Sequence, residues 1–205
     1  MFISIEGIEG VGKSTLILKL KSYFESLGER VVLSREPGGT ELSEKIRSIL
    51  IDPNMGGKIS LNAELFLFYA SRFQNHEENL VPALESGAVL IIDRYVDSSE
   101  AYQGYGRGID LKKFELLNSK FDLTKPDLTL WLDAPVEVGM KRALNRNKLD
   151  RFEQEKFNFF EKIRQGFSTI NKAEPERFKR IDATLSEDQV FNQAVAIIEE
   201  YNKAK

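Results

Sequence analysis

A glycine-rich segment near the start of the chain constrains the fold more than any other feature. Residues 7–14 read Gly-Ile-Glu-Gly-Val-Gly-Lys-Ser and match the pattern G-x-x-x-x-G-K-[ST] in full. The segment follows a short apolar run at 2–5 and opens a helical pattern at 13–27. A strand, a glycine-rich turn and a helix in this order form a nest of backbone N–H groups that binds phosphate. The sequence therefore predicts an α/β domain that binds a nucleoside triphosphate.

The chemistry of this phosphate-binding loop, or P-loop, gives its residues separate roles. Glycines let the backbone wrap around phosphate oxygens, Lys13 can reach the β- and γ-phosphates, and the Ser14 hydroxyl can bind Mg²⁺. The chain has no cysteine and a single histidine, so the metal must be one that oxygen ligands hold, as Mg²⁺ is. The residues expected to contact the triphosphate are Gly7, Ile8, Glu9, Gly10, Val11, Gly12, Lys13, Ser14 and Thr15.

Short apolar runs alternate with helical patterns along the whole chain. Strands are predicted at 2–5, 31–33, 89–92, 128–132 and 178–181. Helices are predicted at 13–27, 40–51, 61–86, 110–121, 135–147, 151–173 and 186–203. Strands that are apolar nearly throughout are typical of a parallel sheet with helices on both faces. With no repeat and no linker, we expect one domain over residues 1–205.

The composition excludes several classes of protein. Lys and Arg number 29 against 32 Asp and Glu, a net charge of −3, whereas a general nucleic-acid binder normally has a basic excess. No apolar run is long enough to span a membrane, and the N-terminus does not read as a secretory signal. We therefore expect a cytoplasmic protein with no nucleic-acid and no membrane partner.

Two arginines after the second predicted strand are candidates for an anion site. Arg35 lies at the end of that strand, where open α/β sheets place ligands. A Pro-Gly-Gly turn follows at 37–39, and Arg47 lies in the helix after it. Arg47 is either a solvated residue or a second group that holds the anion.

Phe68 and Arg72 are four residues apart in the helix predicted at 61–86 and share one of its faces. An aromatic ring beside a guanidinium can stack on a nucleobase and hydrogen-bond its edge. Core packing is the competing interpretation of Phe68, because aromatic stripes on helices are usually core. Leu65 and Tyr69 form a second apolar row that can fill the core instead.

The third strand ends in Asp93 and Arg94. A carboxylate at that position can hold the water shell of Mg²⁺, and the arginine can meet an anion in the same crevice. The polar, glycine-rich residues 98–108 follow directly, with interleaved tyrosines. They read as a loop, and the connection to Asp93 and Arg94 favours contact with a substrate over simple exposure.

Arg142, Arg146 and Arg151 form the last cluster, within a segment at about 141–154. Such a run is usually a solvated face. Beside a P-loop it can instead be a lid whose arginine stabilises charge on the transferred phosphoryl group. The guanine-reading pattern N-K-x-D also occurs, at 147–150. We discount a GTPase because no buried strand precedes that pattern and no D-x-x-G occurs in the chain.

Taken together, these motifs resemble the thymidylate kinase family over essentially the whole chain. The residues that carry the resemblance are 7–14, 35–40, Phe68 with Arg72, 93–95, 102–108 and 149–153. The bacterial subtype is the nearest match, because the P-loop carries no arginine and the lid segment carries three.

The resemblance implies a three-layer P-loop NTPase fold with a five-stranded parallel sheet, acting as a homodimer. It implies phosphoryl transfer from ATP to dTMP with Mg²⁺. The residues it assigns to dTMP binding are Glu9, Arg35, Glu36, Pro37, Arg47, Phe68, Arg72, Arg94, Ser99, Tyr102 and Gln103. The residues it assigns to catalysis are Lys13, Arg94, Arg146, Arg151 and Glu9, with Ser14 and Asp93 toward the metal.

Within this assignment Phe68 stacks on thymine, Arg72 bonds its carbonyl edge and Tyr102 crowds the sugar 2′ position. Two alternatives to the assignment stay open on the sequence. Another nucleoside monophosphate kinase would share the loop and the arginines, and a non-kinase P-loop ATPase would use the loop to drive a partner.

Overall fold

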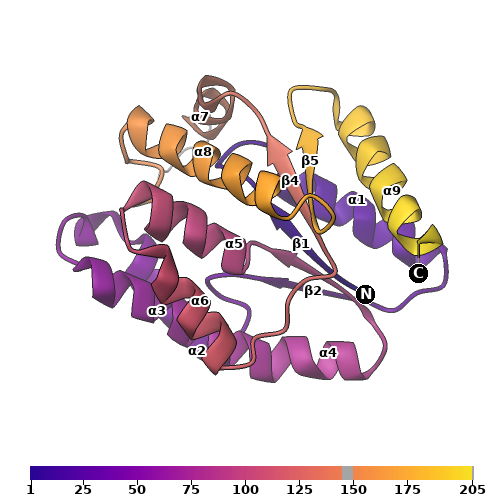
Figure 1. Ribbon diagram of the computed structural model, residues 1–205, viewed down its shortest axis with the longest axis horizontal. Coiled ribbons are helices and arrows are strands. Elements are labelled where there is room, and N and C mark those ends of the chain that lie inside the picture. Colours follow the sequence, from indigo (N-terminus) through magenta and orange to yellow (C-terminus); the bar gives the residue numbers. More distant parts are fainter. Residues whose placement is uncertain (145–149, 205) are drawn as a thin grey trace.

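A computed structural model describes residues 1–144 and 150–204 of the chain. Its centre is a parallel sheet with the strand order β2-β3-β1-β4-β5 (Figure 1). The strands are β1 (Phe2–Glu6), β2 (Val31–Arg35), β3 (Val89–Asp93), β4 (Leu128–Asp133) and β5 (Phe178–Asp182). β1 and β4 are buried along their whole length. The five apolar runs of the sequence are thus the five strands, and the predicted α/β class is confirmed.

Helices connect each strand to the next. They are α1 (Lys13–Ser26), α2 (Glu41–Ile51), α3 (Leu61–Asn75), α4 (Val81–Glu85), α5 (Val96–Ser99), α6 (Leu111–Lys120), α7 (Val136–Leu144), α8 (Phe157–Ala173) and α9 (Glu187–Lys203). A 3₁₀ turn at Pro53–Met55 and two π-helical segments at His76–Leu80 and Glu100–Gly106 complete the described elements.

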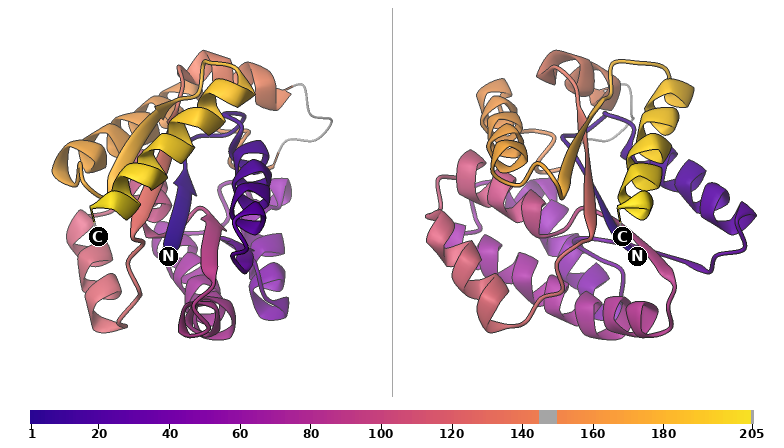
Figure 2. Two further views of the ribbon diagram at one scale, coloured as in Figure 1. Left: turned by 90° about the vertical axis from the view of Figure 1, so that its right-hand side faces the viewer. Right: turned by 45° about the vertical axis from the view of Figure 1, so that its right-hand side comes forward.

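The helices form a layer on each side of the sheet. In the right-hand view of Figure 2, α1 and α9 lie on one side of the strands, and α8, α6 and α3 lie on the other. The largest core cluster joins strand residues such as Ile5 and Leu130 to Leu20 of α1, Ile198 of α9 and Phe167 of α8. Both faces of the sheet are therefore covered, which is why its strands are apolar nearly throughout.

Residues 98–108, which read as a loop in the sequence, are mostly helical and buried. α5 continues into the π-helical segment Glu100–Gly106. A Cβ atom at Gly104 would lie 2.6 Å from Leu111 Cδ2, and one at Gly106 would lie 2.7 Å from Phe159 Cε2. These glycines permit close packing against Leu111 and against Phe159 of α8, and residues 98–108 are not the exposed loop that their composition suggests.

Two other predicted helices differ in their bounds. The helix expected at 61–86 is interrupted by the π-helical segment His76–Leu80, and α8 begins at Phe157 instead of residue 151. Residues 151–155 form turns in its place, because the Asp150 carboxylate accepts hydrogen bonds from the backbone N–H groups of Phe152 and Glu153. Within the two described ranges, no helix is long and apolar enough to cross a membrane.

Candidate active site

The P-loop joins β1 to α1 and has the backbone that its glycines predict. Gly7, Gly10 and Gly12 have φ angles of 138°, 74° and 97°, a region that residues with a side chain rarely adopt. A Cβ atom on Gly7 would lie 2.5 Å from the carbonyl oxygen of Leu132. Gly12 precedes α1 directly, so the loop ends at the N-terminus of that helix.

Gly10 of this loop lies in direct contact with Gly139 of α7. A Cβ atom on Gly10 would lie 2.1 Å from the carbonyl oxygen of Gly139, and a Cβ atom on Gly139 would lie 2.6 Å from the carbonyl oxygen of Glu9. The two backbones therefore touch without intervening side chains. α7 leads from this contact into the segment predicted as a lid.

Lys13 lies buried within the loop. Its Nζ donates hydrogen bonds to the carbonyl oxygens of Gly7 at 3.1 Å and Ile8 at 2.8 Å. Burial, together with the neighbouring Arg94, lowers the pKa of Lys13 to about 8. A phosphate group at the loop would supply the negative charge that favours the protonated amine.

A recess lies beside the P-loop, next to α7 and the start of α9. Its lining includes Gly12, Thr15, Arg142 and Ala183. Arg142 Nη1 donates to the carbonyl oxygen of Ala183 at 3.2 Å, which joins α7 to the loop after β5. Sequence reasoning did not place residues 183–187 at the site, because they lie about 170 residues from the P-loop and carry no motif.

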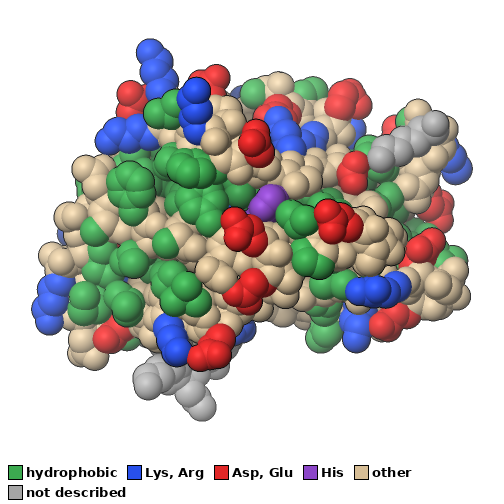
Figure 3. Space-filling view, turned by 90° about the horizontal axis from the view of Figure 1, so that it is seen from below, with side chains coloured by type: hydrophobic (Ala, Val, Ile, Leu, Met, Phe, Trp, Pro, Cys, Tyr) green, Lys and Arg blue, Asp and Glu red, His purple; other side chains and the backbone are tan. Residues whose placement is uncertain are grey.

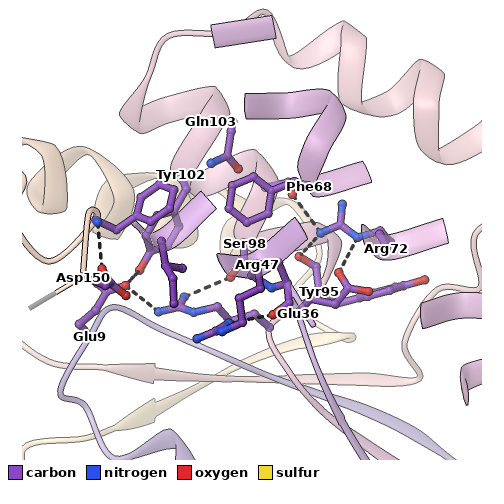
Figure 4. Close-up of a pocket in the computed structure, with 15 residues that line it drawn as sticks. Glu9, Glu36, Arg47, Phe68, Arg72, Tyr95, Ser98, Tyr102, Gln103 and Asp150 are labelled. Carbon is purple, nitrogen blue, oxygen red and sulfur yellow. Dashed lines mark hydrogen bonds and ion pairs between the residues drawn. The ribbon is translucent and has the colours of Figure 1, made fainter. Parts of the chain in front are cut away.

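A deeper cavity lies on the other side of the loop, where β1, β2 and β3 end (Figure 4). The space between its atoms is about 530 Å³ when the open solvent at its mouth is included. Its lining contains every residue predicted for the acceptor except Arg35: Glu9, Glu36, Pro37, Arg47, Phe68, Arg72, Arg94, Ser99, Tyr102 and Gln103. The structure adds Ile51, Tyr95, Ser98, Asp150 and Phe152 to this lining.

Arg72 lies at the floor of the cavity and is held on several sides. Its Nε donates to Glu36 Oε2 at 2.7 Å, and its Nη2 donates to the Tyr95 carbonyl oxygen at 3.1 Å and to Ser99 Oγ at 2.9 Å. Burial raises the pKa of Glu36 although Arg72 opposes that shift. Arg72 Nη1 is buried and has no partner among the described residues. One nitrogen of Arg72 is therefore not bonded by the described part of the protein.

Three aromatic rings surround the space near Arg72. Phe68 packs edge-to-face on Phe152 with ring centroids 5.8 Å apart, and Phe152 packs likewise on Tyr102 at 6.1 Å. Figure 4 shows the Phe68 ring and Arg72 toward the same end of the cavity, with Tyr102 toward the end of Glu9. Phe68 is only partly buried, so core packing does not account for all of its surface.

Arg94 connects this cavity to the P-loop. It has φ +68°, rare for a residue with a side chain. Its Nη1 donates to the Gly7 carbonyl oxygen at 2.9 Å, and its Nη2 donates to Glu9 Oε1 at 2.9 Å. The Tyr102 hydroxyl donates to the same oxygen at 2.7 Å. One guanidinium therefore lies between the two cavities.

A carboxyl group beneath this arginine supports the turn that carries it. Glu6 ends β1 and accepts hydrogen bonds from the backbone N–H of Tyr95 at 2.8 Å and from the Ser98 hydroxyl. Ser98 Oγ also accepts from Arg94 Nη1 at 3.2 Å. Burial, followed by repulsion from Asp97, raises the pKa of Glu6 to about 8.

Two predicted site arginines lie elsewhere. Arg35 is exposed and donates to both carboxylate oxygens of Glu44, at 3.2 and 2.8 Å, so this pairing turns it away from the cavity. Arg151 is buried, and its Nη1 lies 2.7 Å from Glu64 Oε2. It does not line the cavity. Its Nη2 is buried and has no partner among the described residues. Arg146, the other predicted lid arginine, lies outside the described residues.

Candidate metal ligands are few. Among the described residues, no group of three or more acidic or histidine side chains could hold a metal ion. Ser14 lies in the first turn of α1, and Asp93 lies at the end of β3 with a buried Oδ1 that has no partner in the described part of the chain. Oxygen donors of this kind fit Mg²⁺ when phosphate oxygens and water complete its shell.

A P-loop next to an arginine-lined cavity for a second anionic ligand defines a P-loop kinase of small molecules. A family model described as thymidylate kinase matches residues 5–194. The chain is 55% identical to thymidylate kinase from Acinetobacter baumannii (strain AYE) over 95% of this chain and 98% of that protein. It is 45% identical to thymidylate kinase from Desulfovibrio desulfuricans, over 98% and 96% of the two chains.

A solved structure agrees with these relatives. The crystal structure of thymidylate kinase from Ehrlichia chaffeensis superposes with a TM-score of 0.78 at 31% identity, covering 97% of this chain and 98% of that one. The chain belongs to the thymidylate kinase family. Its reaction is the phosphorylation of dTMP in dTTP synthesis, with ATP as the phosphoryl donor. The interpretations as a GTPase and as a non-kinase P-loop ATPase are therefore excluded.

Proposed function

We propose that the cavity at the ends of β1, β2 and β3 holds dTMP while the P-loop holds ATP. The observation that carries this proposal is the free donor of Arg72, buried beside Phe68 at the cavity floor. Thymine has carbonyl oxygens at its edge, so it offers an acceptor to Arg72 Nη1 and a flat face to the Phe68 ring.

The sugar and the phosphate of dTMP point from the base toward the P-loop. Tyr102 is held by Glu9 and lies beneath Arg94, whose guanidinium carbon is 4.8 Å from the ring centroid. It crowds the sugar 2′ position and favours deoxyribose. Arg94 and Arg47 hold the acceptor phosphate, and Arg47 is already fixed by a 2.8 Å bond to the Pro37 carbonyl oxygen.

The chemical step requires no strong base, because the attacking oxygen of the dTMP phosphate is already anionic. That oxygen forms a bond to the γ-phosphorus of ATP while the bond from this phosphorus to the β,γ-bridging oxygen breaks, giving dTDP and ADP. Lys13 and Arg94 neutralise charge on the reacting phosphates and hold them in line. Mg²⁺ held near Ser14 and Asp93 would neutralise further charge on the ATP phosphates.

The lid segment supplies the arginine that stabilises charge on the transferred phosphoryl group, and Arg146 is the candidate tested first. Arg151 is engaged by Glu64, and Arg142 bonds the Ala183 carbonyl oxygen. Arg146→Ala is expected to lower kcat strongly.

A homodimer is the second part of the proposal. Large hydrophobic side chains are exposed on α2, α3 and α6 and at the end of α6: Leu42, Ile49, Leu61, Phe66, Leu111, Leu116 and Phe121. These helices are neighbours, since α2 packs on α3 and the Tyr69 hydroxyl of α3 donates to Asn118 of α6. Figure 3 shows hydrophobic side chains gathered on the side where Figure 1 places these helices. Such a surface supports association with a second copy.

ADP release measured against a panel of nucleoside monophosphates tests the function. We expect stimulation by dTMP and much weaker stimulation by the other monophosphates, including 5-methyluridine 5′-monophosphate, the ribose analogue of dTMP. A stronger response to another base would contradict the proposed thymine site. Since ATP and dTMP are nucleotides of the cytoplasm, the reaction is expected there.

A further inference from the structure

Glu64 is a buried carboxylate for which the mechanism has no use. It lies on α3, four residues before Phe68 and eight before Arg72, so the three side chains follow one face of the helix. Only 2% of its surface is exposed. Glutamate is almost never buried to this extent unless it is paired.

Donors from two other segments converge on this carboxylate. Arg151 Nη1 lies 2.7 Å from Oε2. Gln103 Nε2 donates to Oε1 at 3.1 Å, and Arg107 Nε donates to the same oxygen at 3.4 Å. Glu64 therefore joins α3 both to the segment that carries Tyr102 and to the chain that follows residue 149.

Arg151 in turn contacts residues of the cavity wall. Its Nε donates to the Leu50 carbonyl oxygen at 2.6 Å, and its backbone N–H donates to the Ile51 carbonyl oxygen at 3.0 Å. Its guanidinium carbon lies 4.3 Å from the centre of the Phe152 ring. Phe152 is thus fixed between Arg151 on one side and Phe68 on another.

We propose that Glu64 is a positioning residue for the acceptor base. By holding Arg151 and Gln103, it keeps Phe152 against Phe68 and completes the aromatic wall beside the donor of Arg72. Glu64 does not itself line the cavity. The inference rests on the proposed dTMP site and adds to it a residue that acts through others.

The charge of Glu64 is essential to this role because its partners are two arginines. Glu64→Gln keeps the size of the side chain but leaves the guanidinium groups of Arg107 and Arg151 near a neutral amide. Removing one partner of a buried ion pair is far more disruptive than neutralising both. Arg151 is then expected to shift, and the Phe152 ring with it.

Steady-state kinetics of Glu64→Gln provide the test. We expect the KM for dTMP to rise about tenfold, because small misplacements in a binding site weaken binding by such factors. The KM for ATP is expected to stay within about twofold, since the P-loop lies on the other side of the cavity. Glu155→Gln is the matched control, because Glu155 pairs with the same Arg107, at 2.6 Å from Nη1. The control is expected to leave both KM values within about twofold.

A merely structural role predicts a different result. Loss of folded enzyme would lower the apparent kcat and leave both KM values unchanged, and that outcome would overturn the proposal, as would an equal rise in both. The single variants Glu64→Gln and Arg151→Gln and the double variant Glu64→Gln/Arg151→Gln form a double-mutant cycle. Because both side chains act through the same ion pair, we expect the KM for dTMP of the double variant to rise no further than that of either single variant. Strict additivity of the single effects would also reject the proposal. Where Glu64→Gln alone does not fold, Arg151→Gln breaks the same ion pair from the other side. It is expected to raise the KM for dTMP and to leave the KM for ATP within about twofold, and an unchanged KM for dTMP would reject the proposal.

Phe68→Ala separates this inference from the function on which it rests. If Phe68→Ala leaves the KM for dTMP unchanged, the base site is wrong and the role of Glu64 fails with it. If Phe68→Ala raises that KM and Glu64→Gln does not, the base site stands and only the role of Glu64 is rejected.

Discussion

Arg72 is held in place by its surroundings in a way that suits binding of the acceptor base. Three hydrogen bonds fix two of its nitrogens, and its guanidinium carbon lies 4.8 Å from the centre of the Tyr69 ring. A preorganised, charged donor contributes about 1.5–3 kcal/mol when it is bonded. Arg72→Ala is therefore expected to raise the KM for dTMP roughly 10- to 150-fold and to change the KM for ATP far less.

Arg72→Lys is the informative companion variant. Lysine keeps the charge but loses the planar fork that bonds Glu36 and Ser99 together, so it should not restore the affinity for dTMP. Equal effects of Arg72→Ala on the two substrates would contradict a base-reading role.

Lys13 predicts a dependence of ATP binding on pH. Its pKa is lowered to about 8 in the nucleotide-free protein by burial and by Arg94, and the protonated amine is the form that attracts phosphate. Affinity for ATP should thus be highest near pH 7 and should fall as the pH rises through 8, because a growing fraction of the amine has lost its proton. Isothermal titration calorimetry between pH 7 and 9.5 measures this, and an affinity that stays constant to pH 9.5 would refute the prediction.

Local spacing explains which site residues were predictable. The P-loop and the pair Phe68 and Arg72 depend on neighbours within a few residues, so the sequence shows them directly. The position of the Arg35 side chain depends on its ion pair with Glu44 in the next helix, which the sequence pattern does not show. The link from Glu64 to Arg151 joins residues 87 positions apart, and no periodicity carries such information.

Among the elements, β1 supports the turn after β3, because Glu6 at its end accepts hydrogen bonds from Tyr95 and Ser98. Its pKa is raised from 4.5 to about 8, so the folded protein keeps a proton that the unfolded chain releases above pH 4.5. The contribution of Glu6 to stability is fully present below pH 4.5 and is lost as the pH rises toward 8.

Glu6→Gln removes this titration while keeping the size of the side chain. Relative to the wild type, the variant should gain stability between pH 5 and pH 8, by on the order of 1 to a few kcal/mol. Urea unfolding at the two pH values measures the difference. A constant difference between variant and wild type across this range would show that Glu6 does not titrate there.

Strands were predicted well because their signal is burial on both faces. Each predicted strand lies within two residues of an observed one at each end. The helical conformation of residues 98–108 was not predicted. Gly104 and Gly106 suggest a loop when the sequence is considered alone, and only their close contacts with Leu111 and Phe159 explain why glycine is needed there. Tertiary contact decided the conformation there, overriding local preference.

For the whole molecule, the exposed apolar surface of α2, α3 and α6 predicts a dimer that one substitution can break. Phe66, on α3, is 60% exposed. Phe66→Asp would place a charge in the interface and is expected to give a monomer in size-exclusion chromatography with light scattering. Leu18→Asp is the control, because Leu18 is equally exposed at 61% but lies on α1, across the sheet. A wild-type monomer, or a dimer unaffected by Phe66→Asp, would reject this interface.

The contact of Gly10 with Gly139 has a mechanical consequence. Because backbone meets backbone there, α7 cannot approach the P-loop any further, and an added methyl group at either position would force them apart. The part of α7 that precedes the lid segment therefore rests directly on the P-loop. A displacement of the P-loop toward α7, such as one caused by the binding of a nucleoside triphosphate, would therefore move α7 directly. No side chain lies between the two backbones to absorb it.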